Sequence, residues 1–118
     1  MNLAARLPML IVLGAGAVAC SANPPAADSW IETLIAEFES APVANPPHRI
    51  VRYRYGGALV YYVPPVCCDQ PSVLYDERGQ VLCRPDGGLS GRGDGRCADF
   101  TSQRRDETLI WSDPRADD

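Results

Sequence analysis

The stretch CCDQPSVLYDERGQVLCRPDGGLSGRGDGRC, from Cys67 to Cys97, decides how this chain folds. It holds four of the five cysteines, two β-prone runs at 73–75 and 80–83, and a Gly-rich segment after them. Gly79, just before the second run, suits the left-handed position of a type I turn followed by a bulge. The stretch therefore predicts a hairpin that leads into a long loop closed by cysteines.

The pairing of these cysteines stays partly open. Cys67 and Cys68 are adjacent, and a vicinal disulfide requires a distorted peptide link, so we expect one of them to bond to Cys83 and the other to Cys97. Two such connectivities exist, and the sequence does not separate them. Zinc modules normally show two close cysteine pairs, whereas Cys83 and Cys97 stand alone. Disulfides are therefore favoured over a zinc site in an exported chain.

The segment between Cys83 and Cys97 is too rich in glycine for a helix or a regular strand. A rigid loop on a small stapled scaffold suits recognition, because little entropy is lost on binding. The candidate binding residues are the charged residues on and beside this loop: Asp69, Asp86, Arg92, Asp94 and Asp99. Asp86 and Asp94 are also weak calcium candidates, although their spacing matches no EF-hand or nonapeptide repeat. The alternative is that the Asp-Gly pairs only form turns.

A second hairpin is predicted upstream. The runs RIVRYRY and ALVYYV flank Gly56 and Gly57, which suit a two-residue turn with positive φ. One face is expected to be core and carries two cross-strand pairs: Val51 with Tyr62, and Tyr53 with Val60. The opposite face carries two further pairs: Arg52 with Tyr61, and Arg54 with Leu59. That second face is either solvated, with arginines lying over tyrosine rings, or a recognition surface for an anion or a peptide.

A helix is predicted over residues 30–40. Ser29 and Glu32 have the spacing of a capping box, and Pro42 ends the helix. Its apolar residues form one stripe that we expect to pack on the sheet: Trp30, Ile31, Leu34, Ile35 and Phe38. The fold class is therefore α+β, in two layers, with one N-terminal helix on an antiparallel sheet of about four strands. The apolar cluster at 109–111 is expected to form a short final strand or turn at the sheet edge.

The N-terminus has the features of an export signal. Residues 1–19 contain Arg6 and an uncharged apolar run shorter than the roughly 18–20 residues of a membrane-spanning helix. Ala17 and Ala19 precede Cys20, which fits either ordinary signal peptidase or a bacterial lipobox. An odd cysteine is a liability in an oxidising compartment, and a lipid on Cys20, such as palmitate, removes it. We therefore expect a lipoprotein, with residues 20–28 as the lipidated cysteine and tether.

The remaining chain suffices for one small domain at 29–113, with a motif core at 50–100 and a frayed tail at 114–118. The net charge of −4 argues against nucleic acid and anionic membrane surfaces as partners. Ser21 after the lipidated cysteine is typical of lipoproteins sorted onward, so we expect an outer-membrane lipoprotein facing the periplasm or the cell surface. The expected partners of this monomer are the membrane, through its lipid, and an envelope protein or glycan.

Three motifs resemble those of an uncharacterised family of bacterial lipoproteins, a domain of unknown function: Cys67-Cys68-Asp69-Gln70, Pro85-Asp86-Gly87-Gly88, and Gly93-Asp94-Gly95 followed by Cys97. The resemblance covers about 50–100, half of the chain. It implies a small exported domain of unknown activity and supplies no catalytic residue.

No enzymatic activity is expected. The single histidine, His48, lies in a Pro-rich linker where we expect it to be solvated, and no nucleophile–base set or Cys-x-x-Cys motif accompanies it. The favoured function is a non-catalytic binding module of the cell envelope that presents the stapled loop. The alternatives are a structural envelope lipoprotein without a discrete ligand and a calcium-stabilised module. Calcium is the one cofactor considered.

Overall fold

A computed structural model describes residues 11, 14, 16, 27–67 and 69–117. The elements run in the order α1 (Ala27–Ser40), β1 (Arg49–Tyr55), β2 (Ala58–Val63), β3 (Val73–Tyr75), β4 (Val81–Cys83), α2 (Phe100–Gln103), β5 (Arg105–Ser112) and the 3-10 helix η1 (Pro114–Asp117). Most of the predicted export signal, Cys20 with its predicted lipid, most of the predicted tether, and Cys68 lie outside the described residues.

The strands form one antiparallel sheet in the order β4-β3-β2-β1-β5. The sheet has five strands rather than the predicted four, because β5 pairs with the free edge of β1. The cluster at 109–111 forms the second half of this edge strand. The first half, RDET, is polar and exposed, so its sequence carried no strand pattern.

The central hairpin has the predicted register. Val51 lies opposite Tyr62, and Tyr53 lies opposite Val60. Gly56 and Gly57 make the turn with φ of 59° and 80°, a left-handed conformation that most side chains disfavour. Gly79 also takes the predicted left-handed position, with φ of 81°, in the β3–β4 turn.

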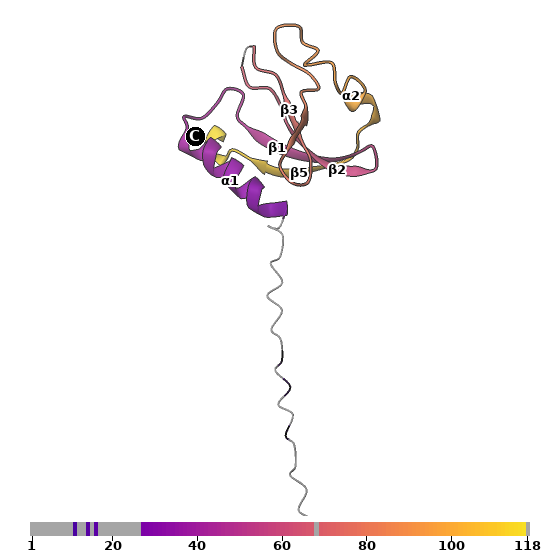
Figure 1. Cartoon of the computed structure of the whole chain (residues 1–118). Coiled ribbons are helices and arrows are strands. Elements are labelled where there is room, and N and C mark those ends of the chain that lie inside the picture. Colours follow the sequence, from indigo (N-terminus) through magenta and orange to yellow (C-terminus); the bar gives the residue numbers. More distant parts are fainter. Residues whose placement is uncertain (1–10, 12–13, 15, 17–26, 68, 118) are drawn as a thin grey trace, which may run out of the picture.

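Helix α1 lies on one side of the sheet (Figure 1). Its apolar stripe packs against a buried cluster as predicted, and the cluster contains Ile31, Ile50, Tyr61 and Val63. Tyr61 is therefore core, and the hairpin face that was expected to be solvated or a recognition surface is the one that the helix covers. The helix begins at Ala27, so Ser29 lies within its first turn and not at the predicted cap position.

The opposite face of the sheet is buried as predicted, but by a different segment. Phe100, at the start of α2, is fully buried and packs edge-on against Tyr53, with ring centroids 5.5 Å apart. The guanidinium of Arg104 lies 4.7 Å from the centre of the Tyr53 ring. The sheet is thus covered on both faces, by α1 on one and by the chain after the Gly-rich segment on the other. This adds a layer to the two that were predicted.

Arg115 lies within the predicted frayed tail but makes several contacts with the rest of the domain. Arg115 in η1 donates hydrogen bonds to the carbonyl oxygens of Phe38 (3.1 Å) and Ala41 (2.8 Å) at the end of α1. It also forms an ion pair of 2.7 Å with Asp113, whose side chain is buried. Carbonyl groups at a helix C-terminus lack hydrogen-bond partners within the helix. Arg115, from the opposite end of the chain, donates the missing hydrogen bonds.

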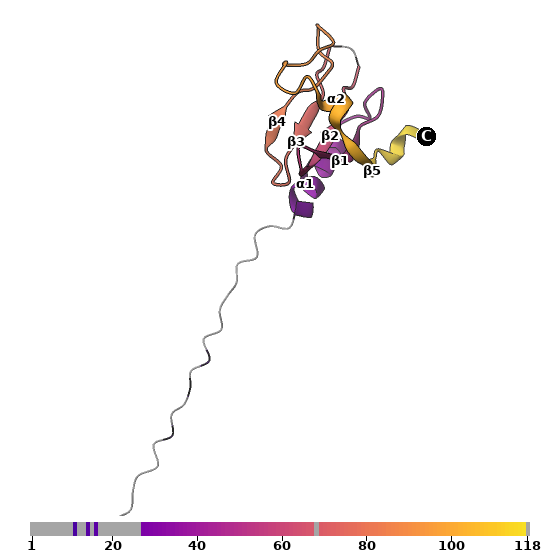
Figure 2. The ribbon, with the colours of Figure 1, turned by 90° about the vertical axis from the view of Figure 1, so that its right-hand side faces the viewer.

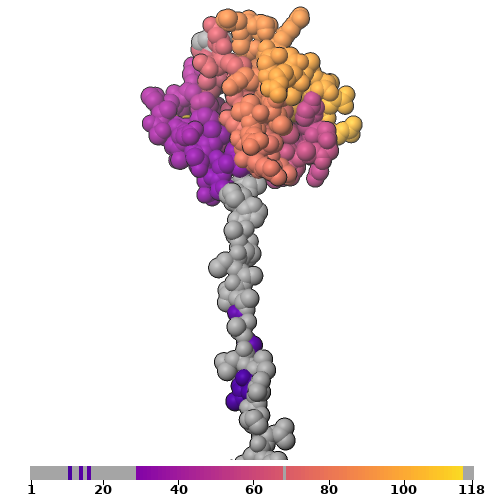
Figure 3. Space-filling model, in the orientation of Figure 1, coloured from indigo at the N-terminus to yellow at the C-terminus, as the bar shows by residue number. Residues whose placement is uncertain are grey.

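The two ends of the domain differ in character. The first turn of α1 lies at one end, and the segments around 64–71 and 84–96 lie at the opposite end, as Figures 1 and 2 both show. In the space-filling view the orange Gly-rich segment projects at the end opposite that first turn (Figure 3). A partner that binds at this end of the domain contacts loops rather than helices or strands.

Candidate functional site

The candidate site is the loop 84–96, which leaves β4 and returns to it through a disulfide. Cys83 bonds to Cys97, with Cα atoms 6.1 Å apart. The prediction that Cys83 and Cys97 would each bond to one member of the adjacent pair is therefore wrong. The loop folds back alongside the end of β4, since the Asp94 amide donates to the Arg84 carbonyl at 2.9 Å, and this return brings the two sulfurs together. Cys67 is also disulfide-bonded.

Asp94 organises the interior of the loop. Its carboxylate accepts hydrogen bonds from the backbone amides of Arg84 (3.0 Å) and Arg96 (2.9 Å), next to the two ends of the loop. These backbone hydrogen bonds lower the pKa of Asp94 below its ordinary value, with the Arg96 amide contributing most. The predicted binding residue Asp94 therefore serves the shape of the loop.

Gly93 explains why the segment contains so much glycine. Its φ is 63°, and a Cβ at this position would lie 1.9 Å from the carbonyl oxygen of Arg84. The backbone of one side of the loop thus lies directly against the other side. The Gly93 amide donates to the carbonyl of Gly87 at 3.1 Å, which adds a second connection across the loop.

Asp86 fastens the loop to the sheet. The hydroxyl of Tyr62, in the central strand β2, donates to the Asp86 carboxylate, with distances of 2.9 and 2.8 Å to its two oxygens. The Asp86 amide donates to the buried Ser72 hydroxyl at 3.1 Å, and the Ser72 amide donates to the Asp86 carbonyl at 3.0 Å. Asp86 is half-buried and its polar groups are engaged by Tyr62 and Ser72, whereas Asp94 is exposed but bonded to the amides of its own loop.

These contacts bear on the calcium hypothesis. Asp86 is bonded to Tyr62, and Asp94 is bonded to loop amides, so neither carboxylate is directed at a shared point. Within residues 27–67 and 69–117, no group of three acidic, histidine or cysteine side chains is placed to hold a metal ion. The two aspartates supply turn and loop hydrogen bonds, which is the alternative that the sequence left open.

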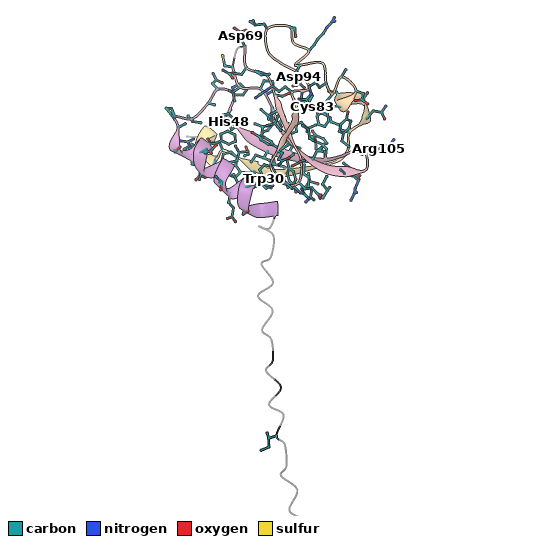
Figure 4. All side chains as sticks on the ribbon, in the orientation of Figure 1. Trp30, His48, Asp69, Cys83, Asp94 and Arg105 are labelled. Atoms are coloured by element: carbon teal, nitrogen blue, oxygen red, sulfur yellow. A yellow bond between two sulfur atoms is a disulfide. The ribbon has the colours of Figure 1, made fainter. Side chains whose placement is uncertain are left out.

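The parts of the loop that face outward are few. Leu89, in the middle of the loop, is 89% exposed, and Arg92, three residues further on, is exposed as well. Asp69 is exposed on the neighbouring segment and lies at the same end of the domain (Figure 4). Two backbone contacts join the segments, since the Gly88 amide donates to the Gln70 carbonyl at 3.2 Å and Gly87 bridges Pro71. Leu89, Arg92 and Asp69 thus form one exposed set, here called the tip residues.

Sequence reasoning found Arg92 and Asp69 but missed Leu89. The signal that marks it is a single leucine inside a segment of glycine, aspartate, arginine and serine, where it has no apolar neighbour to pack against. Single exposed apolar side chains are common on protein surfaces, so the interest of Leu89 lies in its place on a fixed loop that also carries the exposed Arg92.

Asp99 does not belong to this site. Its carboxylate accepts a hydrogen bond from the Tyr55 hydroxyl, which raises the pKa of Tyr55, and it lines a shallow groove with Arg54 and Arg105. Figure 4 places Arg105 at the side of the domain, away from Asp69. The structure therefore divides the five predicted binding residues into two at the tip, two inside the loop and one elsewhere.

His48 also departs from prediction. It was expected to be solvated, but its ring stacks on Phe38 with centroids 3.9 Å apart, and its Nδ1 atom is buried. Burial lowers the pKa of His48, and the nearby Asp113 carboxylate opposes this effect. Stacking within the structure, rather than the linker sequence, determines its environment.

Residues 36–113 match the family described as "Domain of unknown function (DUF6970)". The match covers more than half of the chain. The chain belongs to this family. The matched region of the DUF6970 domain contains the whole sheet and the loop, together with the end of α1 that Phe38 occupies. No curated protein and no solved structure matches the chain. In the part of the chain that the structure describes, no helix combines the length and the apolar character that a membrane crossing requires.

Proposed function

We propose that this protein is an exported, lipid-anchored bacterial lipoprotein whose domain acts as a non-catalytic binding module of the cell envelope. The tip residues Leu89, Arg92 and Asp69 contact the partner, which is an envelope protein or a glycan. The proposal has two parts, the anchor and the contact surface, and each rests on a different observation.

The observation that carries the contact surface is the exposure of Leu89 on a loop that is otherwise fully fixed. The disulfide, Asp94 and Asp86 tie the loop to β4 and β2, while Leu89 remains 89% exposed. A rigid loop loses little conformational entropy when it binds, so its exposed side chains contribute efficiently to affinity. An exposed apolar side chain, an exposed arginine and an exposed carboxylate at the same end of the domain supply the chemistry of a small recognition surface.

The orientation of the domain supports the anchor. A lipid on Cys20 attaches the chain through its N-terminal side, and the first turn of α1 lies at the end of the domain opposite the loop (Figures 1 and 2). A domain held in this way presents the tip residues away from the membrane. The odd number of cysteines gives a separate reason for lipid on Cys20. Cys83 bonds to Cys97 and Cys67 is also disulfide-bonded, so pairing in twos leaves one of the five cysteines over.

The structure sharpens the test of the contact surface. Replacing every charged and glycine residue of the loop would remove Asp86, Asp94 and Gly93, which hold its shape, and loss of binding would then have two explanations. The informative variant changes only exposed side chains: Leu89→Thr with Arg92→Gln. Its matched control changes one exposed leucine and one exposed arginine elsewhere, Leu109→Thr with Arg78→Gln.

The experiment is chemical cross-linking of the full chain in its native membrane, followed by purification and mass spectrometry. We expect a specific cross-linked partner with the native protein and the control variant, and its loss with the Leu89→Thr/Arg92→Gln variant at an unchanged melting temperature. Equal cross-linking in all three proteins would refute the tip surface. The absence of any partner would favour a purely structural lipoprotein.

A separate measurement tests the anchor. The intact mass of the protein from its native membrane fraction should carry two or three acyl chains on Cys20. An unmodified thiol at Cys20, or a mature chain released into the soluble fraction, would contradict lipidation and leave the contact surface untouched.

A further inference from the structure

A second concave feature lies under the loop, between α1, the 64–71 segment and the end of β4. It has a volume of about 140 Å³ and is lined mainly by apolar side chains, among them Phe38, Val66 and Tyr75. At about 30 Å³ per water molecule this is room for four or five waters, or for one compact organic molecule. We call it the His48 hollow, because His48 is the polar residue on its α1 side.

His48, one of the lining residues, has a buried polar atom without a hydrogen-bond partner. Among the described residues, His48 Nδ1 is the buried side-chain nitrogen or oxygen that makes no hydrogen bond. Buried polar atoms in native proteins nearly always have a hydrogen-bond partner, and an exception indicates a water, an ion or a ligand. The ring itself is fixed by stacking on Phe38 at 3.9 Å, so Nδ1 holds one direction.

The charge of the hollow is positive. Arg84 lines it, and within the described residues its guanidinium makes no ion pair with a carboxylate. Gln70 supplies a neutral amide, and no lining residue carries a carboxylate. The nearest acidic groups act from outside the lining: Asp113 on His48, and Glu37 on Tyr75. A guanidinium favours carboxylate ligands, which it binds with charge-assisted hydrogen bonds.

We propose that the His48 hollow binds a small aliphatic monocarboxylate. The carboxylate accepts charge-assisted hydrogen bonds from Arg84 beside the His48 ring, and the short apolar chain packs against Phe38, Val66 and Tyr75. A short-chain acid of the size of propionate or butyrate matches the volume of the hollow. This site is independent of the tip residues and of the partner proposed for them.

The test is an NMR titration of the isotopically labelled full chain with butyrate at neutral pH, and with butyramide as an uncharged molecule of the same shape. We expect saturable shifts of the His48 ring and the Val66 methyl groups with butyrate, and binding of butyramide at least about tenfold weaker. Equal binding of the two would overturn the proposal, as would no saturable shift at millimolar butyrate, which would mean that the hollow holds water only.

Two variants and one control complete the design. Arg84→Gln removes the guanidinium but keeps the backbone amide that Asp94 holds, so we expect folded protein and about tenfold weaker butyrate binding. Arg96→Gln changes an exposed arginine of the same loop that lies outside the lining, and it also keeps a backbone amide that Asp94 holds, so this control should bind butyrate like the native protein. Val66→Phe should fill the hollow and abolish binding. If Val66→Phe fails to fold, Arg84→Gln decides alone: unchanged affinity in that variant would refute the site.

Discussion

The indole of Trp30 in α1 lies directly on the backbone of Gly79 in the β3–β4 turn. A Cβ at Gly79 would lie 2.6 Å from Trp30 Cδ2, which is closer than real side chains approach. The Trp30 Nε1 group donates to the carbonyl of Glu77 at 2.9 Å, and its ring packs edge-on against Tyr61 at 5.2 Å. Trp30 therefore joins the helix both to the turn and to the centre of the sheet.

This contact predicts that Gly79→Ala destabilises the domain through two effects. The left-handed φ of 81° costs a side chain about 1–2 kcal/mol, and the overlap with Trp30 adds about 1–3 kcal/mol. Gly57→Ala is the matched control, because its φ is 80° and a Cβ there would contact nothing within 4 Å. Urea denaturation should show the larger loss for Gly79→Ala. Equal losses would mean that the helix shifts freely and that the Trp30 contact contributes nothing.

The second prediction concerns the hydrogen bond that ties the loop to the sheet. Burial, followed by the contact with Asp86, raises the pKa of Tyr62, so its hydroxyl stays protonated and donates. Hydrogen bonds to charged groups typically contribute about 1.5–3 kcal/mol, and partial exposure reduces this. We expect Tyr62→Phe to lower the free energy of unfolding by about 1–2 kcal/mol. Tyr75→Phe is the control, since the described structure gives the Tyr75 hydroxyl no hydrogen bond, and it should cost clearly less.

Removal of the disulfide is the third prediction. A crosslink that closes a loop of 14 residues is expected to stabilise the folded state by about 3 kcal/mol. The double variant Cys83→Ala/Cys97→Ala should lose about this much in urea denaturation, and limited proteolysis should then cut within 84–96 before the sheet unfolds. Resistance of the loop to protease in this variant would show that Asp94 and Asp86 hold it without the disulfide.

The fourth prediction is a dependence of stability on pH that arises from His48. Its folded-state pKa lies below the ordinary 6.5 because burial disfavours the charged ring. The unfolded chain therefore binds more protons, and stability falls as the pH drops from about 6.5 towards the folded pKa. His48→Phe keeps the stacking on Phe38 but cannot titrate. Urea denaturation at about pH 7.5 and about pH 5.5 should show a smaller pH effect in His48→Phe, and an unchanged effect would assign it to other groups.

The fifth prediction concerns the C-terminal clamp. Arg115→Met removes the donors that satisfy the last carbonyls of α1 and leaves the buried Asp113 carboxylate without its ion pair. We expect a clear fall in the melting temperature, because an uncompensated buried charge is strongly destabilising. Arg105→Met, on the exposed side of β5, should leave the melting temperature nearly unchanged. A native-like melting temperature for Arg115→Met would instead support the prediction from the sequence that the C-terminal tail is frayed.

Local sequence patterns predicted the elements that depend on neighbouring residues. The register of the central hairpin follows from the Gly56-Gly57 turn, and the buried stripe of α1 follows from its helical spacing. Gly79 takes the conformation that its position in the turn requires. In each of these cases the deciding interactions lie within a few residues along the chain.

The errors lie where distant segments meet. Tyr61 was expected on a hairpin face that is solvated or serves as a recognition surface. Which face of the sheet α1 covers depends on which face the chain after Cys83 occupies. Phe100 packs on the second face of the sheet, and no periodic sequence pattern predicted this contact. The contacts of Arg115 and the polar first half of β5 were not predicted, because their partners in α1 and β1 precede them by more than fifty residues.

The candidate site divides in the same way. The sequence by itself determined that a Gly-rich loop with charged residues lies between two cysteines, because composition fixes what the backbone can form. Only the tertiary structure decided that Cys83 bonds to Cys97, that Asp86 bonds to Tyr62 and Asp94 to the amides of its own loop, and that Leu89 is exposed. The physical reason is that these outcomes depend on hydrogen bonds and packing between β2, β4 and the returning loop, which are close in space and distant along the chain.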